Sequence, residues 1–215
     1  MRQIIIMYLF LLPGVALFIH SKHGNKRQSA VIVKALCTGI IVLTSWIAML
    51  GTPAEFQIPA MLIVAGLTFG FIADIVICYH LPLGMVFFGI GHLCYALAMF
   101  CLSRQLLLSI PIFITLYGLI IFLFQKSRIS PGKLLIPGII YSLIITIMVS
   151  LCATIPFSFP GSGSVLLSGA LLFFLSDAIS AGNSLKRFNE RMDTVSLYCY
   201  YIGQSLFAVS IFLLW

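Results

Sequence analysis

The sequence predicts an all-α membrane protein with eight transmembrane helices and with both termini outside the cytoplasm. Of its 215 residues, 61% are hydrophobic and only 8% are charged, whereas a soluble domain carries about 25% charged residues. The mean hydropathy is +1.17. Apolar runs close to the roughly 20 residues that cross a bilayer fill the chain. We therefore expect one integral membrane domain over residues 1–215, and neither a soluble nor a disordered protein.

The eight expected spans follow one another with short connections. They cover residues 3–20, 30–50, 58–78, 82–102, 108–125, 133–154, 164–181 and 194–214. Continuous runs of this length indicate helices rather than the alternating strands of a membrane barrel. The first run has no small-residue cleavage site, so we interpret it as a span rather than a signal peptide. Residues 51–53 predict a turn, and residues 158–163 predict a Pro/Gly/Ser linker.

The loop charges predict the orientation of the bundle. Loops 1–2, 3–4, 5–6 and 7–8 share one side and hold nine basic residues: Lys22, Lys26, Arg27, Lys126, Arg128, Lys133, Lys186, Arg187 and Arg191. The other side holds only Arg2 and Arg104. The positive-inside rule places the basic loops in the cytoplasm. This asymmetry explains the net charge of +7 without a nucleic-acid partner. The short loops suggest a bacterial inner membrane, with an internal eukaryotic membrane as the alternative.

The cysteines predict buried thiols rather than a metal or redox site. All six lie in apolar runs and none forms a CxxC pair. We therefore expect neither a disulfide nor a metal site, and no cofactor.

Three ionisable residues lie within the expected spans: Lys34 in the second, Asp74 in the third and Asp177 in the seventh. A charge at mid-helix costs about 2.5–3.5 kcal/mol on insertion, so such residues usually face a bundle interior and mark function. Counted from the span ends, all three lie about 6 Å below the cytoplasmic boundary. The alternatives are a structural ion pair and, for Lys34, a side chain that extends to the lipid headgroups.

Polar residues of other spans are expected near the same place. Tyr201 and Gln204 share one face of the eighth span, His92 lies near the middle of the fourth, and Tyr141 lies about two turns into the sixth. The alternatives are an interfacial aromatic belt for the tyrosines and a helix-to-helix hydrogen bond for His92.

The sequence also contains a possible internal repeat of four spans. The matching segments are Gly66-x4-Phe71-x2-Asp74 with Gly169-x4-Phe174-x2-Asp177, and Gly91-His92-x2-Tyr95-Ala96 with Gly203-Gln204-x2-Phe207-Ala208. Spans four apart run in the same direction, so the halves would be related by an axis along the membrane normal. Such an axis would bring the two aspartates together.

Two acids in a site of low dielectric constant cannot both ionise cheaply. One keeps its proton near neutrality and can donate it, while the other stays ionised and acts as a base. Such a pair can perform acid-assisted hydrolysis with a positioned water molecule. The motifs HExxH and Gly-x-Ser-x-Gly and a phosphate-binding glycine loop are absent from the sequence.

Several segments resemble the YhhN-like family of lysoplasmalogenases over nearly the whole chain. They are Phe174-Leu175-Ser176-Asp177-Ala178, Gly91-His92-Leu93-Cys94-Tyr95, Tyr200-Tyr201-Ile202-Gly203-Gln204, and Lys34. Ala73 and Ala35 stand where the family pattern usually has Gly before the aspartate and Pro after the lysine. The resemblance implies cleavage of the vinyl ether bond of a lysoplasmalogen to a fatty aldehyde and a glycerophospho-base.

The functional hypothesis is therefore a membrane hydrolase with Asp74 and Asp177 as the acid–base pair. Lys34, at headgroup depth, would hold the substrate phosphate, and the polar residues named above would bind substrate or orient water. The alternatives are a proton-coupled transporter that uses the same aspartates, and a membrane scaffold or lipid-binding protein without catalysis.

Overall fold

The computed structural model describes residues 27–127, 132, 135–186 and 190–214, and this part of the chain is helical with no strand. The long helices are α2 (Arg27–Leu50), α3 (Gln57–Val76), α4 (Leu81–Leu102), α5 (Leu106–Ser127), α6 (Leu135–Cys152), α7 (Pro160–Lys186) and α8 (Glu190–Phe212). Short 3-10 helices, η1 (Ala54–Phe56) and η3 (Ile155–Phe157), precede α3 and α7. Within the described residues, seven helices are long and apolar enough to cross a membrane. The all-α prediction is confirmed, and the expected span 3–20 lies outside the described residues.

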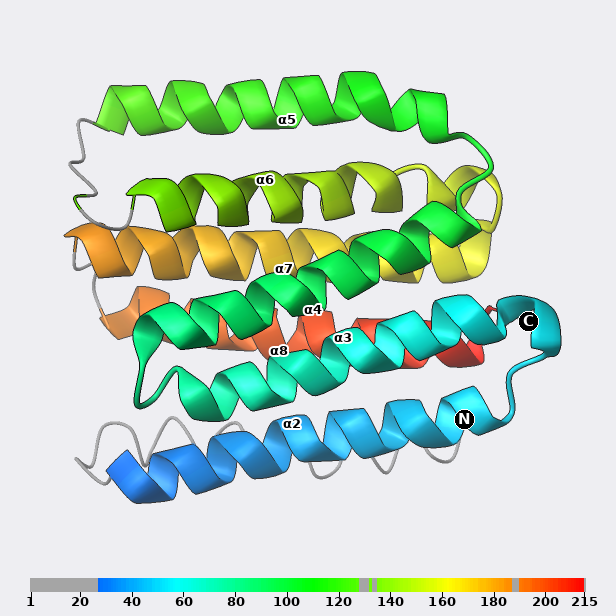
Figure 1. Ribbon diagram of the computed structural model, residues 1–215, viewed down its shortest axis with the longest axis horizontal. Helices are drawn as coiled ribbons and strands as arrows, with labels where there is room; N and C mark the ends of the chain where they lie inside the picture. The colour runs from blue at the N-terminus through cyan, green and yellow to red at the C-terminus, as the bar shows by residue number, and fades with distance from the viewer. Residues whose placement is uncertain (1–26, 128–131, 133–134, 187–189, 215) are drawn as a thin grey trace.

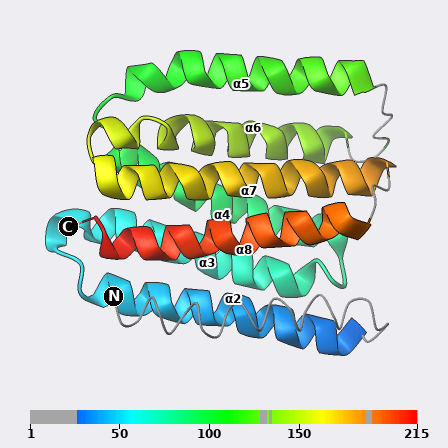
Figure 2. The same cartoon turned by 180° about the vertical axis from the view of Figure 1, so that it is seen from behind.

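The helices form two layers at the centre of the bundle (Figure 1). Helices α3 and α4 pack against each other in one layer, and α7 and α8 form the layer behind them, which Figure 2 shows from the other side. Helix α2 packs on α3 and α8, while α6 packs on α4 and α7. Helix α5 lies at the edge of the bundle, along α6, and buries none of its residues.

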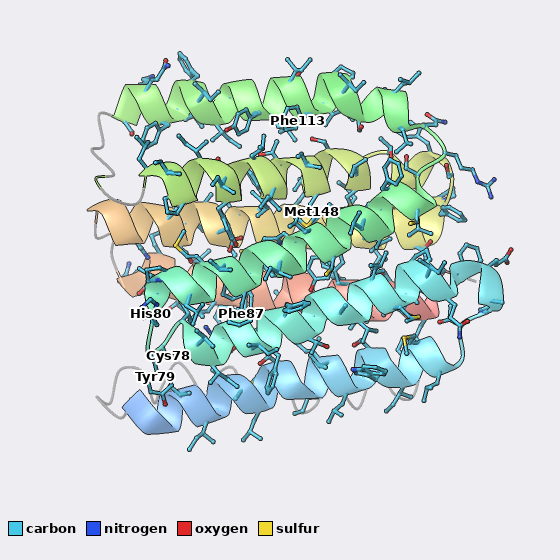
Figure 3. All side chains as sticks on the ribbon, viewed as in Figure 1. Cys78, Tyr79, His80, Phe87, Phe113 and Met148 are labelled. Atoms are coloured by element: carbon cyan, nitrogen blue, oxygen red, sulfur yellow. The ribbon has the colours of Figure 1, made fainter. Side chains whose placement is uncertain are left out.

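The helices alternate in direction, which gives the bundle two distinct ends. We call the end where α2, α4, α6 and α8 begin the basic end, because Lys126 and Arg191 lie there and Arg104 lies at the opposite end. Cys78, Tyr79 and His80 form the turn from α3 to α4 at the basic end (Figure 3). Five basic residues of the loops lie outside the described part: Lys22, Lys26, Arg128, Lys133 and Arg187.

The predicted linker at 158–163 is wrong from Pro160 onwards, where α7 already begins. Proline suits the first turn of a helix because its missing N–H has no helical partner there. The helix also continues to Lys186. Asp177 is therefore nine residues before the end of its helix, whereas Asp74 is only two before the end of α3. The common depth that we counted from the span ends does not follow from the ends of these helices.

Small residues let the paired helices cross closely at two places. A Cβ on Gly91 would lie 3.0 Å from the carbonyl oxygen of Gly66, and one on Gly203 would lie 3.0 Å from that of Gly169. These crossings join α3 to α4 and α7 to α8 at matching positions of the predicted repeat. Close backbone approach of this kind is the usual role of small residues between membrane helices.

Aromatic rings fill the centre where the two layers meet. The rings of Tyr95 and Phe207 stack with centroids 4.3 Å apart and an interplanar angle of 11°. Both residues are buried, and they occupy matching positions in the predicted repeat. Equivalent residues that lie near a twofold axis contact each other, so this packing is consistent with the repeat.

Candidate functional site

Lys34 and Asp74 form an ion pair inside the bundle, between α2 and α3. Lys34 Nζ lies 2.9 Å from Asp74 Oδ1, and the side chains are 13% and 0% exposed. A lone charge in this position would cost several kcal/mol, and a partner at contact distance offsets much of that cost. The structure therefore gives the ammonium of Lys34, expected to hold a phosphate, a carboxylate partner within the protein.

Helix α8 completes this cluster with a tyrosine and an amide. The Tyr200 hydroxyl donates to Asp74 Oδ2 at 2.7 Å, and Gln204 Nε2 donates to the Tyr200 oxygen at 2.6 Å. The two residues are one helical turn apart and so face the same side. Gly70 makes room for this amide, because a Cβ there would lie 2.8 Å from Gln204 Nε2. We call Lys34, Asp74, Tyr200 and Gln204 the lysine cluster.

A second cluster joins α4, α6 and α7. The Tyr141 hydroxyl donates to Asp177 Oδ2 at 2.6 Å, and His92 Nε2 lies 3.2 Å from the same oxygen and 2.9 Å from the Tyr141 hydroxyl. His92 is 1% exposed, whereas the Asp177 side chain is 21% exposed. We call His92, Tyr141 and Asp177 the histidine cluster.

The two clusters adjoin through aromatic rings. The Phe173 ring lies 4.9 Å from the His92 ring and 5.2 Å from the Tyr200 ring, measured between centroids. Each aspartate has its own partners, and among the contacts of the described residues the carboxylates do not touch. The expectation that the two carboxylates meet is therefore corrected, because each binds within its own cluster and the Phe173 ring lies against both clusters.

Apart from Asp74 Oδ1, which contacts Lys34, four buried polar atoms in and around the clusters have no hydrogen-bond partner in the described structure: His92 Nδ1, Tyr95 Oη, Tyr201 Oη and Gln204 Oε1. Buried polar atoms are nearly always paired in native proteins, with protein groups or with water. Unpaired atoms gathered in one region are positions where water or the polar part of a substrate can bind. This region is therefore the candidate site.

The histidine cluster is partly exposed on its α6 side. Every described residue of α6 up to Ile144 is partly or fully exposed, whereas Ile145, Thr146 and Met148 are buried. Tyr141 lies in the exposed half, next to the 21% exposed Asp177. An apolar chain in the membrane can therefore approach the histidine cluster from the side.

The structure brings the sequence-predicted site residues into these two clusters, apart from Tyr201. Its ring packs against Tyr200, with centroids 5.2 Å apart. Tyr200, which is not among the predicted site residues, is the tyrosine that bonds Asp74. Its spacing of four residues from Gln204 was the available signal. Within the described residues, no group of three His, Cys, Asp or Glu side chains could hold a metal ion.

A hollow of about 670 Å³ lies at the opposite end of the bundle, around the connection from α4 to α5. Its lining residues are Ser103, Arg104, Gln105, Leu106, Leu107, Leu108 and Pro111. None of them belongs to either cluster, so the hollow is separate from the candidate site.

Fold and site together define a class: a helical membrane protein with two carboxylate clusters inside its bundle. The model of the YhhN family matches residues 5–211, and the chain belongs to this family. Comparisons with curated proteins and with solved structures gave no match.

Proposed function

We propose that the protein is a membrane-embedded hydrolase that cleaves the vinyl ether bond of lysoplasmalogens. The products are a fatty aldehyde and a glycerophospho-base. One observation carries the proposal: two aspartates from distant spans each accept a tyrosine hydroxyl inside one bundle, Asp74 from Tyr200 and Asp177 from Tyr141. Membership of the YhhN family and the resemblance to its lysoplasmalogenases supply the substrate class.

Vinyl ether hydrolysis needs an acid and an activated water, and no covalent nucleophile. Protonation of the β-carbon converts the ether to an oxocarbenium ion. Water then adds to the carbon bonded to oxygen, and the hemiacetal collapses to an aldehyde and the free glycerol hydroxyl. Carboxyl groups can supply the proton and accept one from water, so we assign this chemistry to the two clusters that hold Asp74 and Asp177.

The remaining polar groups suit substrate and water. His92 and Tyr141 fix the Asp177 carboxyl, while the free acceptor of Gln204 and the Tyr201 hydroxyl can hold water or an ether oxygen. The alkenyl chain would lie along the exposed half of α6, and the headgroup would lie at the basic end. We propose that this end faces the cytoplasm, in keeping with the positive-inside rule.

The transport alternative requires a polar path through the opposite half of the bundle. The buried hydroxyls there include Ser45, Ser150 and Ser210, and each donates to a carbonyl of its own helix three or four residues earlier. Hydroxyls bonded in this way are not available as a chain of proton carriers. This pattern favours a site that is closed at one end.

The direct test measures fatty aldehyde released by the purified full-length protein from lysoplasmenylethanolamine in mixed micelles. Two matched lipids, with an alkyl ether or an ester in place of the vinyl ether, serve as substrate controls. We expect aldehyde from the vinyl ether alone. Absence of aldehyde with a folded protein, or proton-coupled uptake into proteoliposomes without hydrolysis, would overturn the proposal.

A further inference from the structure

The two aspartates differ in their surroundings. The Asp74 side chain is fully enclosed and contacts a lysine ammonium. Asp177 is 21% exposed, and no lysine or arginine among the described residues forms an ion pair with it. The two aspartates are 103 residues apart in the sequence. Counting the same number of residues on from Lys34 gives Pro137, which carries no charge.

The clusters otherwise follow one plan. In each, a tyrosine hydroxyl donates to the aspartate and contacts a side-chain nitrogen from the half of the chain that does not hold the aspartate: His92 for Asp177, and Gln204 for Asp74. His92 and Gln204 occupy matching positions in the repeat. The lysine is thus the main chemical difference between two similar arrangements.

We propose that Asp177 delivers the proton to the substrate, and that Asp74 is a permanently ionised positioning residue held by Lys34. This assignment rests on the function proposed above. Lys34 is accordingly a partner of Asp74 and not the group that binds the substrate phosphate.

The hydrogen bonds of Asp177 suit a proton donor. Both Tyr141 and His92 Nε2 approach Oδ2, which leaves Oδ1 to carry the acidic proton. When the proton leaves, the negative charge forms on a carboxylate that already accepts from the Tyr141 hydroxyl and, in the tautomer with a proton on Nε2, also from His92. Hydrogen bonds to a charged acceptor are stronger than those to a neutral one, so this arrangement favours the transition state.

The proposed step balances. The C=C electron pair takes the Asp177 proton and forms a C–H bond at the β-carbon, and an ether oxygen lone pair forms the C=O bond of the oxocarbenium ion. The O–H pair stays on Asp177 as a carboxylate. Water adds to the cationic carbon and returns a proton to Asp177. Transfer of the hydroxyl proton to the glycerol oxygen then breaks the hemiacetal into aldehyde and alcohol.

Asp74 acts through its neighbours. A proton on Asp74 would leave the Lys34 ammonium buried without a counter-charge, which is unfavourable. The ionised carboxylate accepts from Tyr200, and the Tyr200 oxygen accepts from Gln204 Nε2. This chain fixes the amide so that Oε1, which has no partner, is available to accept a hydrogen bond from the attacking water.

Chemical rescue tests the assignment. Asp177→Ala and Asp74→Ala are assayed for aldehyde release from lysoplasmenylethanolamine with added formate over a pH series. The double variant, assayed in parallel, gives the uncatalysed rate. Formate should raise the rate of Asp177→Ala at least about tenfold, because an external acid can replace a lost general acid. That gain should follow the concentration of undissociated formic acid and be absent in Asp74→Ala. Rescue of Asp74→Ala alone, or of neither variant, would overturn the assignment.

The role of Lys34 is tested with two substrates, lysoplasmenylethanolamine and the 1-alkenylglycerol that lacks phosphate. We expect Lys34→Met to lower kcat/KM by the same factor for both, chiefly through kcat. Lys34→Arg, which keeps the charge, should have a smaller loss of kcat/KM than Lys34→Met on both substrates. It also provides a folded variant for this test if Lys34→Met does not fold. A loss confined to the phosphate-bearing substrate would assign Lys34 to the headgroup instead.

The donor role of His92 has a conservative test. His92→Gln keeps an N–H that can reach Asp177, whereas His92→Leu removes it. We expect His92→Gln to keep most of kcat and His92→Leu to lose it, with KM little changed in both. Equal loss in the two variants would contradict the donor role. An inactive wild-type protein would count against the proposed function, whereas these patterns in an active protein test the roles alone.

Discussion

At the residue scale, Lys34 and Asp74 stabilise each other in a place that neither would occupy alone. Their charged atoms are 2.9 Å apart and the carboxylate is fully enclosed. Removing one partner of a buried pair leaves an uncompensated charge, whereas replacing both by neutral groups is often tolerated. Stability and activity should therefore respond differently to single and paired substitutions here.

We predict that Lys34→Met lowers the stability of the fold by about 3–5 kcal/mol. Lys34→Met/Asp74→Asn should recover most of that loss, because no buried charge is then left unpaired. Thermal unfolding in detergent, with size-exclusion chromatography as the readout, measures the stability of both variants. The double variant should still be defective in aldehyde release. Equal destabilisation of the single and double variants would contradict the ion pair.

Tyr200→Phe should lower kcat by roughly tenfold to a hundredfold, because a hydrogen bond to a charged group contributes about 1.5–3 kcal/mol. Steady-state aldehyde release measures the effect. Tyr198→Phe is the matched control, since Tyr198 is 41% exposed on the same helix, and its activity should be unchanged. Wild-type kcat in Tyr200→Phe would show that the bond to Asp74 is not used.

Residue identities in the site were predictable in large part, and their pairings were not. A charge in an apolar span identified Lys34, Asp74 and Asp177, because such a charge is costly wherever it lies. The partners come from other helices: Tyr200 and Asp74 are 126 residues apart in the chain. Helical periodicity places a residue on a face but does not say which helix that face meets.

At the element scale, close crossings between glycines bring the helices to the separation that the site needs. The crossing of α7 and α8 places Gly203 against backbone, with the Gly169 oxygen 3.0 Å and the Phe173 nitrogen 3.3 Å from the position of a Cβ. Backbone atoms cannot move aside as a flexible side-chain end can. Phe173 and Asp177 are one turn apart on α7, so a shift of this helix also moves the site.

We predict that Gly203→Ala destabilises the protein by about 1–3 kcal/mol, because the added methyl group overpacks the crossing. Thermal unfolding should show a lower Tm and the aldehyde assay a lower rate. The control is Gly118→Ala in α5, where a Cβ would meet nothing within 4 Å. Its Tm should be unchanged or slightly higher. A Tm for Gly203→Ala equal to that of the control would contradict the close crossing.

Element positions followed from apolar run lengths with small errors at the ends. The start of α7 was placed at 164 instead of Pro160, because Pro, Gly and Ser were interpreted as a linker although proline is also favoured at a helix start. Glycine-rich helix starts are ambiguous in this way. The glycines of the predicted repeat, Gly66 with Gly169 and Gly91 with Gly203, are the ones that lie at the two close crossings, although no crossing was predicted from them.

At the scale of the whole molecule, both clusters lie in one bundle whose loops are basic at one end. Lys126 marks the basic end and Gln105 the opposite end. The positive-inside rule predicts that the basic end faces the cytoplasm. Sequence alone predicted which end of the bundle is basic, since this depends only on the number of Lys and Arg residues in each loop. It could not predict the packing order of the helices, which depends on contacts between faces.

Labelling of introduced cysteines tests this orientation. In a variant without its native cysteines, Gln105→Cys should react with a membrane-impermeant maleimide in right-side-out vesicles, and Lys126→Cys should react only after permeabilisation. Both residues are exposed in the structure, so access to the reagent is limited by the membrane alone. The reverse pattern would place the basic end, and the substrate headgroup, on the outer side.

The central claim is that hydrolysis needs both aspartates inside the bundle, Asp74 and Asp177. Aldehyde release from lysoplasmenylethanolamine by the wild-type protein, Asp74→Asn and Asp177→Asn, each confirmed as folded by its unfolding curve, tests it most directly. We predict measurable turnover in the wild-type protein and a loss of roughly 10²–10⁴-fold in each variant. Wild-type turnover in both folded variants would contradict the claim.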